Sequence, residues 1–148
     1  MAQELPSIVN PGFEHGIAGW TSQGKIDTEA HSGQYSLKHG AGNLETSQTI
    51  RNLPNGWYTL RAWVRSSGNQ NAAHIALKDY GGEPVQTDVP ISRNDWLNIV
   101  VSAEVTNQQC TLSLVSAADG KAWVNFDDIE FTPGRAALTI MGADISSL

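Results

Sequence analysis

Aromatic side chains stand close to hydrogen-bonding side chains in three alternating segments of this sequence. The three groups are Trp63 with Arg65, His74 with Lys78 and Tyr80, and Trp123 with Asn125. The apolar face of a sugar ring lies flat on an aromatic ring, while Arg, Asn or Lys side chains bond its hydroxyl groups in a fixed geometry. A polar run over residues 66–71, which includes Asn71, offers further amide groups. These residue types therefore suit a carbohydrate ligand.

Each of these features also has a purely structural interpretation. Trp63 or Trp123 could pack under a loop or fill a second core, and the run 69–71 could simply be a hairpin turn. Trp20 and Trp96 stand beside turn residues, where a Trp more often closes a core than meets a ligand. The residue pattern alone leaves both interpretations open.

Acidic residues near the two ends of the chain form a second group. Glu14 lies close to the N-terminus, and Asp127 and Asp128 lie more than a hundred residues later. A sandwich can bring such distant segments together on neighbouring strands. Oxygen ligands from separate segments, with loop carbonyls, are what Ca²⁺ requires. The alternative is that these are surface carboxylates or turn-forming Asp residues.

Patterns that indicate catalysis are weak in this chain. There is no Gly-rich phosphate loop, no nucleophile elbow and no Cys-x-x-Cys pair. Asp79 and Glu83 could serve as an acid and a base, but any sandwich of this size offers such a pair. The four histidines have no metal-ligand spacing: His15, His31, His39 and His74. We therefore expect a binding function rather than an enzymatic one.

The charge and composition of the chain narrow its possible partners. The 15 acidic and 9 basic residues give a net charge of -6. Nucleic acids and anionic membranes attract basic surfaces, so we expect neither as a partner. A length of 148 residues, 40% hydrophobic and 16% charged, fits one globular domain with a buried core. Five Trp against three Phe favour the presentation of flat apolar faces to a neutral ligand.

Few features indicate a cellular compartment. The single cysteine, Cys110, excludes an intrachain disulfide, and its alternating surroundings predict a buried, unreactive thiol. Residues 1–6 have neither the basic nor the apolar region of a signal peptide, and no stretch is long enough to span a membrane. The start at Met1 and Ala2 is compatible with an export signal that has been removed.

Alternating segments separated by turn residues fill most of the chain. Strands are expected at 36–39, 45–50, 57–65, 74–80, 96–105, 111–116 and 122–131. Turn residues recur about every ten positions and no helical period persists, which predicts an all-β protein with an antiparallel β-sandwich fold. A Pro-Gly turn at 133–134 and a linker over 132–137 precede the apolar run 140–148, which predicts the first strand of a further domain.

The alternation also assigns faces to the strands. Tyr58, Leu60, Ala62 and Val64 share one face and are expected in the core. The same rule turns Ile75, Leu77, Val124 and Phe126 inward. The three aromatic and polar groups should then lie on faces turned away from the core.

Four segments, in order along the chain, resemble noncatalytic carbohydrate-binding modules with a galactose-binding-like jelly roll. The segments are Val9-Asn10-Pro11-Gly12-Phe13-Glu14 followed by Gly19-Trp20, then 30–38, 58–64 and 124–131. The resemblance covers residues 8–132, and it implies that residues 1–132 form one carbohydrate-binding module.

The resemblance becomes narrower in two further segments. Residues 68–82 are similar to carbohydrate-binding module family 61, and residues 142–148 resemble the opening of the catalytic barrel of glycoside hydrolase family 53, the endo-β-1,4-galactanases. Residues 133–148 would then be a linker and the truncated start of that catalytic domain. The resemblance implies a secreted or cell-surface monomer that binds β-1,4-galactan or galacto-oligosaccharides and targets a tethered galactanase.

The resemblance also implies one structural Ca²⁺. Carried over residue by residue, Glu14 and Asp127 would supply side chains, and Gly12 and Ser32 would supply carbonyl oxygens. A β-bulge in the last strand would turn Asp128 toward the ion instead of Asp127.

The sequence predicts the following ligand contacts: Trp63, Arg65, Asn71, His74, Tyr80, Trp123 and Asn125. Two other functions stay open. The same fold could bind another glycan, such as xylan, a β-glucan or terminal galactose. It could also bind no sugar and pack as a structural domain on a catalytic barrel.

Overall fold

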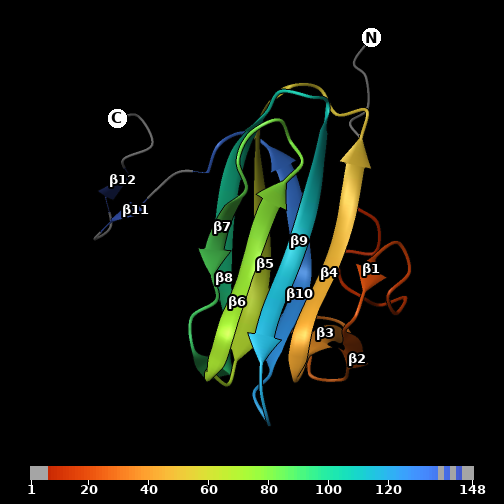
Figure 1. Cartoon of the computed structure of the whole chain (residues 1–148), viewed down its shortest axis with the longest axis vertical. Helices are drawn as coiled ribbons and strands as arrows, with labels where there is room; N and C mark the ends of the chain where they lie inside the picture. Colours follow the sequence, from red (N-terminus) through yellow and green to blue (C-terminus); the bar gives the residue numbers. More distant parts are fainter. Residues whose placement is uncertain (1–6, 137–138, 141–142, 145–148) are drawn as a thin grey trace.

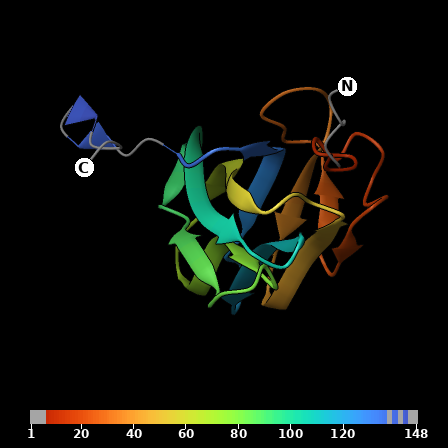
Figure 2. The ribbon, with the colours of Figure 1, turned by 90° about the horizontal axis from the view of Figure 1, so that it is seen from above.

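Two antiparallel sheets of five strands each lie face to face in this chain (Figures 1 and 2). The computed structural model describes residues 7–136, 139–140 and 143–144. Sheet A has the strand order β1 (Thr21–Ser22), β4 (Gly42–Arg51), β9 (Gln109–Ala118), β6 (Gln70–Lys78) and β7 (Val85–Asp88). Sheet B has the order β2 (Lys25–Asp27), β3 (Ser36–His39), β10 (Val124–Pro133), β5 (Gly56–Ser66) and β8 (Ser92–Val105). A separate pair consists of β11 (Thr139–Ile140) and β12 (Ala143–Asp144).

The predicted all-β antiparallel sandwich is confirmed. Each of the seven expected strands overlaps an observed one, and the strand expected at 36–39 has the same bounds as β3. Three further strands were not predicted, because β1, β2 and β7 are two, three and four residues long and too short for alternation to be recognised. In the described part of the chain, no helix has the length and apolar character needed to cross a membrane.

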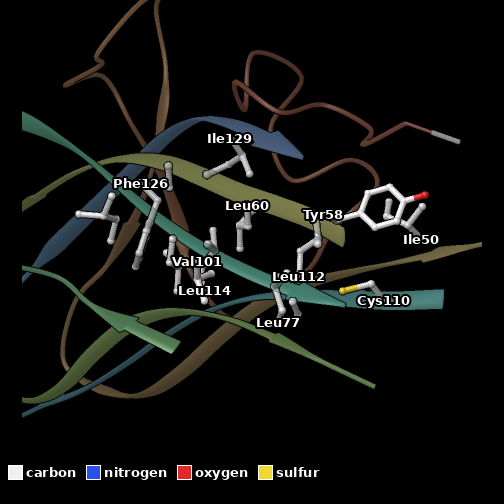
Figure 3. Close-up of a cluster of buried hydrophobic side chains, with 14 of the residues drawn as sticks. Ile50, Tyr58, Leu60, Leu77, Val101, Cys110, Leu112, Leu114, Phe126 and Ile129 are labelled. Atoms are coloured by element: carbon white, nitrogen blue, oxygen red, sulfur yellow. The ribbon is translucent and has the colours of Figure 1, made fainter. Parts of the chain in front are cut away.

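The core consists of the inward-facing side chains of both sheets. Leu60, Val101 and Phe126 of sheet B face Leu77, Leu112 and Leu114 of sheet A, as Figure 3 shows. The residues expected inward are all buried: Tyr58, Leu60, Ala62, Val64, Ile75, Leu77, Val124 and Phe126. The period-2 pattern therefore predicted the core correctly, because successive side chains of a strand alternate between its two faces.

The single cysteine also lies in this core. Cys110 is buried on β9, and burial raises the pKa of its thiol to about 12. Since the thiolate is the reactive form, Cys110 is inert at neutral pH, as expected.

The chain leaves the sandwich along the outer side of β5. The Gly134 N–H donates to the Trp57 carbonyl at 2.7 Å, and the Thr59 hydroxyl donates to the Gly134 carbonyl at 2.7 Å. The Ala136 N–H donates to the Ser102 hydroxyl oxygen at 3.0 Å. Residues 134–136, expected to be part of a linker, are thus bonded to the sandwich. Most of the segment compared with a galactanase barrel, 142–148, lies outside the described residues.

A buried histidine joins the two sheets. His39 on β3 of sheet B is fully buried, and its Nδ1 and Nε2 lie 2.9 Å from the Ser116 hydroxyl and 2.8 Å from the Thr46 hydroxyl. Ser116 and Thr46 belong to β9 and β4 of sheet A. Burial lowers the pKa of His39 from 6.5 to about 4. The imidazole is therefore neutral at physiological pH and acts as a polar bridge within the core.

Acidification should destabilise the protein through His39. The unfolded state binds a proton at about pH 6.5 and the folded state only near pH 4. The stability from neutral His39 is thus complete above pH 6.5 and falls as the pH drops toward 4, by on the order of 3 kcal/mol at most. Urea unfolding at pH 7 and pH 4.5 measures this loss, which should be smaller in His39→Gln than in the wild type.

The exposed His15 provides the matched control. His15→Gln should keep the pH dependence of the wild type, so other titrating groups cancel in the comparison. An identical loss of stability in the wild type and in His39→Gln would contradict this role of His39.

Candidate functional site

Three tryptophans gather on the outer side of sheet B. Trp63 lies on β5, Trp96 on β8, and Trp123 immediately before β10. We call these residues the tryptophan face. The Arg65 guanidinium carbon lies 5.6 Å from the centre of the Trp96 ring and 5.2 Å from that of Trp123. The cation–π attraction of both rings holds Arg65 between them.

Arg65 is largely used in this internal arrangement. Its Nη2 donates to the Arg93 carbonyl at 2.8 Å, and its Nη1 pairs with the Glu29 carboxylate at 3.3 Å. The side chain is only 15% exposed. Arg65 was predicted as a ligand contact, and its contacts here are those of a support for Trp96 and Trp123.

Trp63 is covered by a histidine. The His31 ring stacks on Trp63 with centroids 3.9 Å apart and an interplanar angle of 12°. The imidazole thus occupies one face of the indole that was expected to meet a sugar ring. Trp96, expected as a core plug, is half-buried on the outer surface and also contacts His31, with ring centroids 5.8 Å apart.

Trp123 lines a cavity of about 260 Å³ at the end of the sandwich. Its backbone is fixed on both sides: its N–H donates to the Ser67 hydroxyl at 2.8 Å, and its carbonyl accepts from Gln70 at 2.7 Å. The other residues that line this cavity are mostly polar: Ser67, Asn69, Arg93, Asp119, Lys121 and Ala122. One aromatic side chain among several hydrogen-bonding ones is the composition expected of a sugar-binding cavity.

A second cavity of about 430 Å³ lies on the other side of Asn69, which lines both. Asn71 and His74 contribute to it, as the sequence analysis grouped them, together with Gln86 and Asp88 of β7. Burial lowers the pKa of His74, against the opposing charges of Asp88 and Glu45. We call the two cavities together the loop-tip site, lined by residues 67–74, Gln86, Asp88, Val89, Ile91, Arg93, Asp119 and 121–123.

The loop-tip site depends on a tight turn between β5 and β6. Gly68 and Asn69 have φ values of 78° and 64°, in the left-handed region. A Cβ atom on Gly68 would lie 2.9 Å from the Ile91 side chain, so only glycine allows this approach. The run 69–71 is therefore both a hairpin turn and part of a cavity wall, and the two interpretations weighed for it do not exclude each other.

Two predicted contacts, Tyr80 and Asn125, are buried and paired internally. The Tyr80 hydroxyl donates to the Glu83 carbonyl, and Asn125 donates to the Asp27 carboxylate at 3.1 Å. Asp79 has a φ of 56°, which breaks the alternation of β6 before Tyr80 is reached. The partner of Asn125, Asp27, lies on β2, a strand that alternation does not reveal. Neither side chain is available to a ligand, so this part of the prediction is corrected.

The acidic residues from the two ends of the chain do come together. The Glu14 carboxylate accepts the N–H groups of Gln34 and Tyr35 at 2.9 and 3.0 Å. The Asp127 carboxylate accepts those of His31 and Ser32 at 2.8 and 3.3 Å. Both carboxylates therefore hold the loop before β3.

Gly12 lies beside the side chains of all three acidic residues. A Cβ atom on Gly12 would be 3.4 Å from Asp128 Oδ1, 3.8 Å from Glu14 Cγ and 3.9 Å from Asp127 Oδ1. The pairing of β10 with β5 shifts between Asp127 and Glu130, and Asp128 has a φ of 47°. This irregularity lets both aspartates reach the same loop, because Asp128 accepts a hydrogen bond from the Ser32 hydroxyl at 2.6 Å.

The electrostatics of this acidic cluster suit a cation. Asp127 is fully buried, and burial raises the pKa of its carboxyl group to about 6, with a further rise from the charge of Asp128. Its charged form is thus penalised at neutral pH, a cost that a bound cation would offset. Among residues 7–136, 139–140 and 143–144, no three Asp, Glu, His or Cys side chains form a complete ligand set. An ion here would also need main-chain oxygens.

His31 connects the acidic cluster to the tryptophan face. Its Nδ1 lies 2.7 Å from Asp128 Oδ2, and its ring stacks on Trp63. Its backbone N–H donates to the Asp127 carboxylate. No sequence pattern indicates this link, because His31 has no metal-ligand spacing and its ring position depends on the loop conformation.

Solved structures of carbohydrate-binding modules share this architecture. The family 61 module TmCBM61, solved in complex with β-1,4-galactotriose, aligns over 88% of this chain and 100% of its own, with a TM-score of 0.77 and 22% identity. A family 16 module aligns over 84% of this chain and 98% of its own, with a TM-score of 0.67 and 22% identity. The CBM22-1 xylan-binding domain of Paenibacillus barcinonensis Xyn10C aligns over 93% and 100%, with a TM-score of 0.62 and 16% identity. The chain has the jelly-roll fold of these modules.

Sequence comparison adds nothing to this structural likeness. No protein-family model matches the chain, and no curated protein matches it. At sequence identities of 22% and below, the structural alignments establish the fold alone. Function has to be argued from the residues of the site.

Replacing Gly33 should disrupt the loop that the carboxylates hold. Gly33 has a φ of 69°, and a Cβ atom there would lie 2.7 Å from the Glu14 carboxyl carbon. Gly33→Ala should therefore cost roughly 1–2 kcal/mol for the left-handed backbone, and roughly 1.5–3 kcal/mol more for the displaced charge-assisted hydrogen bonds. Urea unfolding measures the total.

Gly16 is a matched control, because it has the same φ of 69° but a Cβ atom there would meet no other atom within 4 Å. Gly16→Ala should show only the backbone cost. Equal destabilisation by the two substitutions would show that the Glu14 contacts do not stabilise the fold.

Proposed function

We propose that this chain is a noncatalytic module that binds β-1,4-galactan at the loop-tip site. The observation that carries the proposal is Trp123, whose cavity is otherwise lined by side chains that bond hydroxyl groups. The fold supports it, because several of the structures that share it are carbohydrate-binding modules and one of them was solved with β-1,4-galactotriose.

The binding mode follows from the lining of the two cavities. The apolar face of one galactose ring packs on Trp123, and Arg93, Asp119 and Lys121 bond its hydroxyl groups. A neighbouring sugar unit extends past Asn69 toward Asn71 and His74. Arg65 takes an indirect part, since it lies against the rings of Trp96 and Trp123. Trp63 stacks on His31, which in turn contacts Trp96.

The wider role of the module rests on the same resemblance. Tethered to a secreted galactanase, it would keep the enzyme close to polysaccharide and raise the local substrate concentration without a new catalytic contact. Xylan is the second candidate ligand, because a xylan-binding domain shares the fold.

Truncation of Trp123 should weaken binding of galactotetraose. Loss of the stacked ring in Trp123→Ala should lower the affinity by about tenfold or more, equivalent to about 1.4 kcal/mol. Trp63→Ala should have a smaller effect, because His31 already covers that indole. Isothermal titration calorimetry measures both affinities.

Two controls decide between the candidates. Trp57→Ala removes an exposed Trp outside the loop-tip site and should leave the affinity unchanged. Absence of binding to galactotetraose by the wild type would overturn the galactan proposal, and binding of xylotetraose in its place would favour xylan. An unchanged affinity in Trp123→Ala would refute this location of the site.

A structural Ca²⁺ at the acidic cluster is part of the proposal. The Glu14 and Asp127 carboxylates and the carbonyl oxygens of Gly12 and Ser32 would hold it, with Asp128 in reach through the β10 irregularity. Such an ion neutralises the buried carboxylate and fastens the N-terminal segment to the last strand of sheet B.

Removal of Ca²⁺ should lower the thermal stability. At a concentration of 100 Kd the ion contributes about 2.7 kcal/mol, which corresponds to about 5 °C or more in Tm for a chain of this size. Differential scanning calorimetry with EDTA and with added Ca²⁺ measures the shift. Asp127→Asn should abolish it, whereas Asp95→Asn, an exposed change on β8, should retain it. A Tm that does not respond to EDTA would argue against the ion.

A further inference from the structure

Two lysines face each other across the edge of sheet B. Lys25 on β2 and Lys38 on β3 are register partners in an antiparallel pair. The register partner of Lys38 on its other side is Asn125 on β10, and that of Asn125 is Arg65 on β5. Like charges directly opposite each other destabilise a sheet, so this pair is unfavourable without a compensating anion.

No carboxylate of the described residues lies within 4.0 Å of either lysine ammonium group, since the ion pairs found there involve other residues. The Asp27 carboxylate nearby accepts a hydrogen bond from Asn125. Burial raises the pKa of Asp27, while hydrogen bonds from Asn125 and the backbone and the charge of Lys38 lower it overall. Asp27 is thus hydrogen-bonded to Asn125 and forms no ion pair with Lys38 within 4.0 Å.

The two lysines line a cavity of about 420 Å³ between β2 and the turn that follows β3. Leu44 and Ala41 contribute apolar surface to the same cavity. Gly24 brings β2 close to β3, because a Cβ atom there would lie only 2.7 Å from the His39 ring. Gly24 therefore lets the backbone at the start of β2 lie close to β3, beside the register pair of Lys25 and Lys38.

This lysine cavity lies at the same end of the sandwich as the loop-tip site. β3 ends at His39, and β10 starts at Val124, the register partner of both His39 and Ser66. β4 starts at Gly42, opposite Ala118 on β9, which in turn pairs with Gln70 on β6. All these strand ends meet at the lower end of the molecule in Figure 1. One extended polysaccharide can therefore lie across both cavities.

We propose that Lys25 and Lys38 form a second site that binds the carboxylate of an acidic sugar, a hexuronic acid unit. This inference rests on the proposed glycan binding, which supplies the class of polymer. The two ammonium groups pair with the carboxylate, and the apolar surface of Leu44 and Ala41 packs on the ring carbons. The module would then select polysaccharides that carry both neutral and acidic units.

Calorimetric titration with galacturonic acid trimer tests the site. The wild type should bind the trimer, and the affinity should fall with added salt, because screening weakens partly exposed charge pairs. Lys25→Gln with Lys38→Gln should weaken binding by tenfold or more. The double variant should unfold at the same or a higher temperature than the wild type, because the like-charge repulsion is gone, so a loss of binding is separable from a loss of fold.

Arg51→Gln and Lys25→Gln are a matched pair of variants, because each removes one positive charge. Arg51 is exposed on β4 outside this cavity, so its removal should leave trimer binding unchanged. Absence of trimer binding by the wild type, or equal affinity in the double lysine variant, would overturn the proposal. Displacement of the trimer by inorganic phosphate at equal concentration would show a general anion site and overturn the choice of an acidic sugar.

Titration with neutral galactotetraose separates the two proposals. The double lysine variant should bind galactotetraose like the wild type. If galactotetraose does not bind while the trimer does, the loop-tip proposal fails and the lysine site stands.

Discussion

The buried carboxylate of Asp127 is the contact on which the arrangement of the loops depends. It accepts backbone N–H groups from His31, Ser32 and Asp128, and so joins β10 to the loop before β3. The same loop receives the Glu14 carboxylate from the N-terminal segment. A buried charge of this kind is unfavourable unless it is bonded, and the three N–H donors offset part of that cost.

The effect of this contact extends beyond the acidic cluster. With the loop in place, His31 stacks on Trp63, and Glu29 pairs with Arg65. Arg65 in turn lies between Trp96 and Trp123. The position of Trp123 therefore depends on packing through several side chains and on the backbone bonds to Ser67 and Gln70, rather than on Trp123 alone.

Features that follow from local alternation could be predicted from the sequence. The inward side chains of β5 and the outward position of Trp63 follow from the two-residue period of a strand. The rule fails to predict the burial of Asn125. This residue has the phase of an outward residue, but it is bonded to Asp27 of the three-residue strand β2 and to Ser36 of β3. The prediction for Tyr80 fails for another reason, because Asp79 has a left-handed backbone and ends the alternation one residue earlier.

The candidate sites depend on information that a single strand does not contain. Glu14 and Asp127 could be grouped, since acidic residues at the two ends of a sandwich can meet, whereas the stacking of His31 on Trp63 requires the conformation of the whole loop. Lys25 and Lys38 are thirteen positions apart, and they face each other because of the register between β2 and β3, which no local pattern specifies.

The path of β10 has a practical consequence. This strand starts beside Trp123 and ends at Pro133, ten residues later, so it separates the cavities from residues 134–136 by roughly 30 Å. Bonds to Trp57, Thr59 and Ser102 fix those last residues against the far end of β5. A fluorophore, a solid support or a fused reporter attached beyond Ala136 therefore leaves the cavities facing away from the attachment. Attachment at this end therefore suits any binding experiment that needs both cavities accessible.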